Sequence, residues 1–140
     1  MNPYARLDAG GTRLRLRALH VMGHGSARIA RALGIRELTV QRLVTGDATT
    51  ISPHLRDAIT DLYDEWWDKR APERTRAERT AAASARRRAE VSNWCAAAAL
   101  DDDLLDLPGY RPRSRWRPAT GNGTAPDIRP PGRRRWEKGA

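Results

Sequence analysis

The stretch from Ser26 to Thr45 constrains the fold more than any other part of the chain. Its aliphatic residues recur every three or four positions on both sides of Gly34, the spacing that places side chains on one helical face. Ala30 is small enough for two helices to approach closely, and Gly34 tolerates the positive φ of a tight turn. We therefore predict two short helices, at 26–33 and 37–45, joined by a turn and held together by inward-facing residues: Ile29, Ala30, Leu33, Gly34, Ile35, Val40 and Leu43.

A further helix is expected before this pair, at residues 12–22, preceded by a flexible arm at residues 1–11. Thr12 is a good N-cap residue, because its side-chain oxygen can accept a hydrogen bond from the first turn. The expected apolar face repeats every three residues: Leu16, Leu19 and Met22. The arginines between these positions are expected in solvent: Arg13, Arg15 and Arg17.

Two later helices have clear start signals. Ser52 is a good N-cap and Pro53 suits the first helical position, so a fourth helix is expected there, with an apolar stripe and an acidic opposite side. Thr75 and Glu78 form a capping-box pattern that starts a fifth helix reaching about residue 91. Its expected apolar stripe consists of alanines spaced by four: Ala77, Ala81, Ala85 and Ala89.

These elements predict an all-α fold, a four- to five-helix bundle that contains the helix pair and is followed by a disordered basic C-terminal tail. The expected segments are a flexible arm at 1–11, a helical domain at 12–70, a basic Ala/Arg-rich helix at 71–93, a Trp/Asp-rich segment at 94–110, and a disordered Arg/Pro/Gly-rich tail at 111–140.

The charge balance favours polyanionic partners. The chain has 26 Lys and Arg against 17 Asp and Glu, for a formal net charge of +9, and nucleic acid is the first class of partner to expect. The single cysteine, Cys95, excludes an internal disulfide and a multi-cysteine zinc site. No apolar run is long enough for a membrane span or resembles a signal peptide. We expect a cytoplasmic, nucleoid-associated protein that does not contact membranes.

The stretch SARIARALGIRELTVQRLVTG resembles the helix-turn-helix of DNA-binding proteins with the lambda-repressor-like fold, and ISPHLRDAITDLY resembles the helix that usually follows it. Residues 12–110 more loosely resemble short helix-turn-helix proteins of GC-rich bacteria and their phages, which end in a tryptophan and an aspartate triplet, as Trp94 and Asp101–Asp103 do here. The resemblance implies a transcriptional regulator that binds double-stranded DNA as a homodimer, with the helix at 37–45 in the major groove. The implied DNA-binding residues are Ser26, Arg36, Glu37, Leu38, Gln41, Arg42 and Thr45.

The chemistry of these side chains suits that role. Arg36 or Arg42 can pair with guanine O6 and N7 or hold a phosphate. Gln41 can bond adenine N6 and N7, Glu37 can accept from cytosine N4, and Leu38 can touch a thymine methyl. Ser26 starts the supporting helix, where family members often contact a phosphate.

The sequence departs from the family pattern at two positions. The family usually has Ser or Thr as the cap of the recognition helix, where this chain has Arg36, and losing such a cap costs about 1 kcal/mol. The family also favours Gln at the position of Ser26, so the serine shortens the reach towards a phosphate.

Several other residues carry a functional and a structural interpretation. The arginines of the fifth helix either contact the DNA backbone or form a solvated face, and Arg133–Arg135 either add affinity or only solubilise the tail. Trp66 is expected in the core, and Trp67 at a rim or in a dimer contact. The acidic cluster of Asp101–Asp103 and Asp106 fits a helix N-cap or a foil to the basic helix better than a metal site. The remaining candidates match no ligand set and no catalytic arrangement: His20, His24, His54 and Cys95.

Three function classes follow, in order of support. The first is sequence-specific binding of double-stranded DNA by a transcriptional regulator. The second is a DNA-associated assembly or adaptor protein, such as a phage packaging or protein-bridging module, that binds a protein partner through residues 71–110. The third, an enzyme, has no supporting constellation, so we expect no catalytic residues, no metal and no cofactor.

Overall fold

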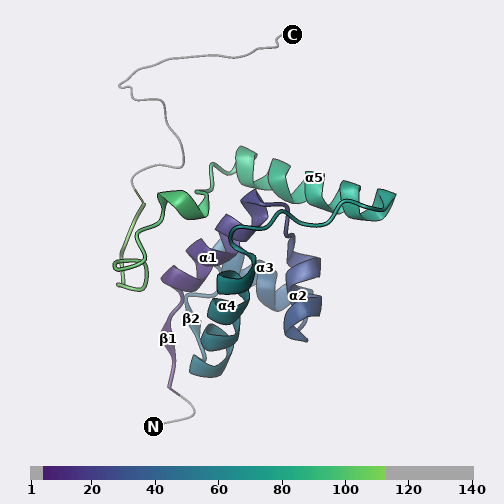
Figure 1. Cartoon of the computed structure of the whole chain (residues 1–140). Helices are drawn as coiled ribbons and strands as arrows, with labels where there is room; N and C mark the ends of the chain where they lie inside the picture. The colour runs from purple at the N-terminus through teal and green to yellow at the C-terminus, as the bar shows by residue number, and fades with distance from the viewer. Residues whose placement is uncertain (1–4, 113–140) are drawn as a thin grey trace, which may run out of the picture.

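The computed structural model describes residues 5–112, and it confirms the predicted all-α bundle. Figure 1 shows α1 at the centre, α2 and α3 on one side of it, α4 alongside, and α5 running across the end of the bundle. The helices are α1 (Gly10–Val21), α2 (Ser26–Leu33), α3 (Glu37–Thr45), α4 (Pro53–Trp66) and α5 (Arg76–Val91), with a short 3-10 helix, η1 (Ala97–Ala99). No helix among the described residues has the length and apolar character needed to cross a membrane.

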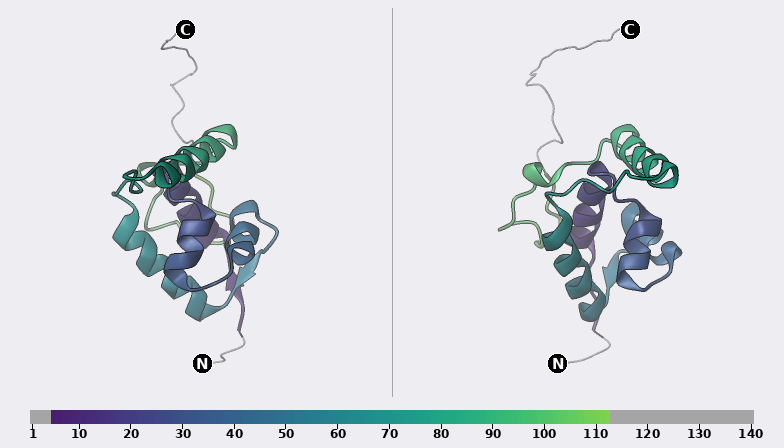
Figure 2. Two further views of the ribbon diagram at one scale, coloured as in Figure 1. Left: turned by 90° about the vertical axis from the view of Figure 1, so that its right-hand side faces the viewer. Right: turned by 45° about the vertical axis from the view of Figure 1, so that its right-hand side comes forward.

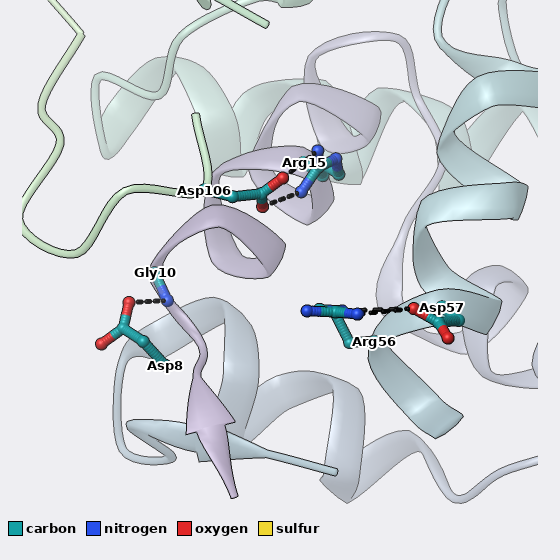
Figure 3. Close-up of polar contacts among 6 residues, drawn as sticks. All are labelled: Asp8, Gly10, Arg15, Arg56, Asp57 and Asp106. Carbon is teal, nitrogen blue, oxygen red and sulfur yellow. Dashed lines mark hydrogen bonds and ion pairs between the residues drawn. The ribbon is translucent and has the colours of Figure 1, made fainter. Parts of the chain in front are cut away.

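The N-terminal segment is more ordered than a flexible arm. β1 (Leu7–Asp8) pairs antiparallel with β2 (Thr50–Ile51), in the register Leu7 to Ile51 and Asp8 to Thr50. The Asp8 carboxylate accepts a hydrogen bond from the Gly10 N–H at 3.0 Å (Figure 3). This contact satisfies an amide at the start of α1, so the helix begins at Gly10 and the predicted cap at Thr12 is wrong. Residues 1–4 lie outside the described part.

The core forms around one face of α1. Leu16 and Leu19 are fully buried as predicted, whereas Met22 is only partly buried because the helix ends at Val21. α1 packs against α3, α4 and α5, so it is the central helix of the bundle. The largest buried aliphatic side chains are Leu16, Leu19, Ile29, Leu43, Ile51, Ile59 and Leu105.

The prediction that the arginines of α1 are solvated is wrong. The Arg13 guanidinium donates to the carbonyls of Leu43 at 3.2 Å and Ala48 at 3.1 Å, and Arg17 donates to the Val44 carbonyl at 2.9 Å. The Leu43 and Val44 carbonyls belong to the last turn of α3, where no intrahelical donor is available. These two arginines therefore cap α3 from a neighbouring helix, where positive charge also complements the helix dipole.

Arg15 is the most buried of the three. It forms an ion pair with Asp106, with Nη1–Oδ1 2.6 Å and Nη2–Oδ2 3.0 Å (Figure 3). The same figure shows a second pair within α4, in which Arg56 donates to Asp57 at 3.0 Å. Leu105, next to Asp106, is 1% exposed in the core. Residues 100–106 are therefore held on the bundle by the Arg15–Asp106 ion pair and by the buried side chain of Leu105.

The predicted starts of α4 and α5 are confirmed. The Ser52 hydroxyl accepts from the Leu55 N–H at 3.2 Å, with Pro53 in the first turn. The Thr75 hydroxyl accepts from the Glu78 N–H at 3.0 Å, and the Glu78 carboxylate accepts from the Thr75 N–H at 3.0 Å, which completes the capping box.

The predicted apolar stripe of α5 is only half right. Ala85 and Ala89 are buried, but the third buried alanine is Ala82, and both Ala77 and Ala81 are exposed. A spacing of four advances about 40° around a helix of 3.6 residues per turn, so Ala77 lies about 120° from Ala89 and the predicted stripe leaves the buried face. Most of the predicted tail, residues 113–140, lies outside the described residues.

Candidate nucleic-acid interface

Helices α2 and α3 form a helix–turn–helix unit through the predicted turn. Gly34 has φ 71° and ψ 31°, the left-handed conformation that glycine adopts without strain. The N–H of Ile35 donates to the Ala30 carbonyl at 3.1 Å, which satisfies the end of α2. Arg36 precedes α3 in an extended conformation and makes no side-chain cap, as its residue type implied.

The predicted inward residues hold this unit in the core. Ile29, Ala30, Val40 and Leu43 are at most 3% exposed. Leu33 and Ile35 are partly buried against the same core, and Gly34 lies at the surface as a turn residue should. Because buried side chains pack both helices against the core, the opposite face of α3 points outwards.

The outward residues of α3 lie on one accessible face. Leu38 is 54% exposed, one of the large apolar side chains at the surface of the described residues. Gln41 is partly buried, and the others are exposed: Arg36, Glu37, Arg42 and Thr45. Positions 37, 38, 41, 42 and 45 share one side of an α-helix, so five of the seven predicted contact residues lie together on α3, and Arg36 is at its N-cap.

Ser26 is the exception, because it lies in the interior. Its side chain is buried, and its hydroxyl lies 3.2 Å from His20 Nε2. His20 Nδ1 donates to the Leu16 carbonyl at 2.8 Å, so Nε2 is the acceptor and Ser26 donates to it. Burial disfavours the imidazolium and lowers the pKa of His20 to about 4. The hydroxyl of Ser26 is thus engaged inside the fold and is not presented for a phosphate contact.

A contact that no sequence pattern indicated joins α5 to α3. Arg88 Nη1 donates to Gln41 Oε1 at 2.8 Å, and the Arg88 guanidinium lies over the ring of Trp94, 5.1 Å from its centroid. Arg88 and Gln41 are 47 positions apart, so local spacing carries no signal of the pair. A groove of about 450 Å³ separates α5 from the two motif helices, lined in part by Ala27, Arg31, Glu37, Gln41, Ser84 and Arg88.

A second cluster fixes the end of α4 beside α2. His24 stacks on Trp66 with centroids 4.5 Å apart, and the Arg28 guanidinium lies 4.4 Å from the Trp66 centroid. His24 Nε2 donates to the Lys69 carbonyl at 2.7 Å, while Nδ1 accepts from Arg28 at 3.2 Å. Trp66 is therefore half-buried, packed against the hydrophobic core as well as these polar groups. Trp67 is 47% exposed, as either a rim residue or a dimer contact would be.

The charges separate across the molecule. Arg31, Arg36 and Arg42 are exposed on α2 and α3, whereas the exposed face of α4 is acidic, with Asp57, Asp61, Asp64 and Glu65. The right-hand view of Figure 2 shows α4 and the α2–α3 pair on opposite sides of α1. In residues 5–112, no three His, Cys, Asp or Glu side chains gather as metal ligands, Asp101–Asp103 included.

Comparisons of this chain with protein-family models, with curated proteins and with solved structures found no match.

Proposed function

We propose that this chain binds double-stranded DNA with sequence preference through α2 and α3 and acts as a transcriptional regulator. The observation that carries the proposal is the outward face of α3, which presents charged, amide and apolar side chains. The inward residues of α2 and α3 are buried: Ile29, Ala30, Val40 and Leu43 are at most 3% exposed. The resemblance of residues 26–45 to the lambda-repressor-like motif supports the same docking, with α3 in the major groove.

Each outward side chain has a base-edge partner in this docking. Arg36 or Arg42 suits the two acceptors of guanine, and Glu37 suits the amino group of cytosine. Gln41 suits the donor and acceptor of adenine, and the exposed Leu38 suits a thymine methyl. Ser26 is buried, so exposed arginines near the DNA major groove, such as Arg31, would make the phosphate contacts instead.

The test is selection of bound duplexes from a random DNA pool near physiological salt, with the full chain. An enriched motif is the expected result, and two half-sites related by a dyad would show a homodimer and give its geometry. Recovery of unenriched DNA with a steep salt dependence would contradict sequence reading and leave only charge attraction.

Exposed apolar side chains favour one alternative, a DNA-associated adaptor with a protein partner at residues 71–110. Val91 is 79% exposed, Leu107 is 55% exposed and Leu104 is 42% exposed, all outside the helix–turn–helix unit. Sedimentation of the purified chain separates the two candidates, because a regulator is expected as a monomer or dimer and a ring-forming adaptor as a higher oligomer.

A further inference from the structure

Arg88 stands outside the helix–turn–helix unit, yet its side chain donates a hydrogen bond of 2.8 Å to Gln41. Gln41 is the outward residue whose amide carries both a donor and an acceptor. Such a side chain reads a base only if its oxygen and nitrogen point in a defined order, because reversing them exchanges donor for acceptor.

The contacts around Gln41 fix that order. Its Oε1 accepts from Arg88, and its Nε2 donates towards Glu37 Oε2 at 3.4 Å. An amide oxygen has two lone pairs and an amide nitrogen has two hydrogens. One lone pair and one N–H therefore remain on the same amide, and adenine N6 and N7 require one acceptor and one donor.

Arg88 is itself held in place by the segment after α5. Its guanidinium lies 5.1 Å from the Trp94 centroid, and Arg17 lies 5.2 Å from the same ring. Trp94 is 8% exposed, and the edge of His20 meets it at 5.3 Å. A guanidinium that lies over a buried ring is held by a cation–π contact, so Trp94 helps to position Arg88 beside Gln41.

Resting on the proposed function, we infer that Arg88 is a specificity-determining positioning residue, which orients the Gln41 amide for adenine from outside the recognition motif. The partner it acts on is an A·T base pair in the major groove. Gln41 lines the adjacent groove and is only partly buried, so its amide is not enclosed by α5.

The experiment compares base preference in the full chain for Arg88→Met, Arg88→Lys, Gln41→Ala and the double variant. Methionine keeps an unbranched side chain of similar reach but cannot donate, whereas lysine restores a donor. Arg87→Met is the matched control, because Arg87 is exposed on the neighbouring position of α5. Thermal unfolding of each variant by circular dichroism checks that it is folded at the binding temperature.

We expect Arg88→Met to reduce adenine preference about three- to tenfold at the one base pair that Gln41→Ala also affects. Lysine should recover part of that preference, the double variant should be no worse than Gln41→Ala alone, and Arg87→Met should leave every base preference unchanged. If Arg88→Met does not fold, the test is the partial loss of adenine preference expected for Arg88→Lys relative to the unmodified chain.

Three results would overturn the inference. Equal weakening on all sequences, with a salt slope lower by about one, would make Arg88 a phosphate contact only. Tighter binding by Arg88→Met with unchanged preference would mean that Arg88 masks Gln41. Absence of any base preference in the unmodified chain would remove the proposed function as well, whereas the first two results leave that function standing.

Discussion

Arg15 and Asp106 face each other across 91 positions of the chain and form two hydrogen bonds, at 2.6 and 3.0 Å. The Arg15 side chain is 9% exposed and that of Asp106 is 61% exposed. The pair therefore joins a nearly buried cation on α1 to a carboxylate that still meets water. It ties the Trp/Asp-rich segment to the helix at the centre of the bundle.

Asp106→Asn should lower the free energy of unfolding by about 1–2 kcal/mol, because it leaves the Arg15 charge nearly buried without its counter-ion. The value is below that of a fully buried pair, since the exposed carboxylate is screened by solvent. Urea unfolding followed by tryptophan fluorescence measures the change. Asp102→Asn, an exposed neighbour, is the control, and an equal loss there would show that the pair has no special role.

The same pair has a pH dependence of predictable sign. The hydrogen bonds from Arg15 lower the pKa of Asp106 below its ordinary value. The contribution of the pair is thus present above about pH 4, the pKa of the unfolded chain, and is lost as the pH falls through the lower folded pKa.

Gly11→Ala should detach the same segment by steric conflict. A Cβ at Gly11 would overlap the Asp106 carboxylate and lie 2.9 Å from the Leu105 carbonyl oxygen. Gly25→Ala is the matched control, because its Cβ would meet Ala85 at an ordinary 3.5 Å. Hydrogen exchange should show faster exchange in residues 100–106 for Gly11→Ala, and unchanged protection there would argue against the anchoring of this segment on α1.

The sequence was sufficient for what local spacing controls. It predicted α2, the turn at Gly34 and α3 with their bounds, and it located the caps at Ser52 and Thr75, because a cap or a turn depends on a few adjacent residues. Burial of the motif core followed from the same periodicity.

Contacts between residues far apart in the sequence could not be predicted from local spacing. Arg13 and Arg17 were expected in water because arginine usually is, but uncapped carbonyls of α3 lie within their reach. The sequence does not distinguish Arg88 from the other arginines of α5, and only the fold places it against Gln41. Ser26 had the right position for a phosphate contact, and only the packing of α1 showed that His20 engages its hydroxyl.

Arg42→Ala should weaken DNA binding about tenfold and lower the slope of affinity against salt by about one if Arg42 contacts a phosphate. If Arg42 instead reads guanine, the loss should concentrate at one base pair and the slope should change little. Fluorescence anisotropy over a range of salt concentrations separates these cases. Arg70→Ala, exposed beyond α4, is the charge-matched control, and an equal effect there would move the interface away from α3.

Acid should destabilise the fold through its buried histidines. Burial lowers the pKa of His20 to about 4 and also lowers that of His24, while both would titrate near 6.5 in the unfolded chain. The neutral rings therefore make their full contribution to the free energy of unfolding above pH 6.5. Between pH 6.5 and pH 4, each pH unit of acidification lowers the free energy of unfolding by up to about 1.4 kcal/mol through His20. Protonation of His24 would also place a hydrogen on Nδ1, which then could no longer accept the hydrogen bond that Arg28 donates to it.

Urea unfolding at pH 7 and pH 5 measures this loss. His20→Gln removes the titrating ring, so its stability should differ less between the two pH values even if it is less stable at both. His54→Gln replaces an exposed histidine and should keep the full pH dependence of the unmodified chain. If His20→Gln and His54→Gln respond to pH alike, the acid sensitivity does not arise from protonation of the buried His20 ring.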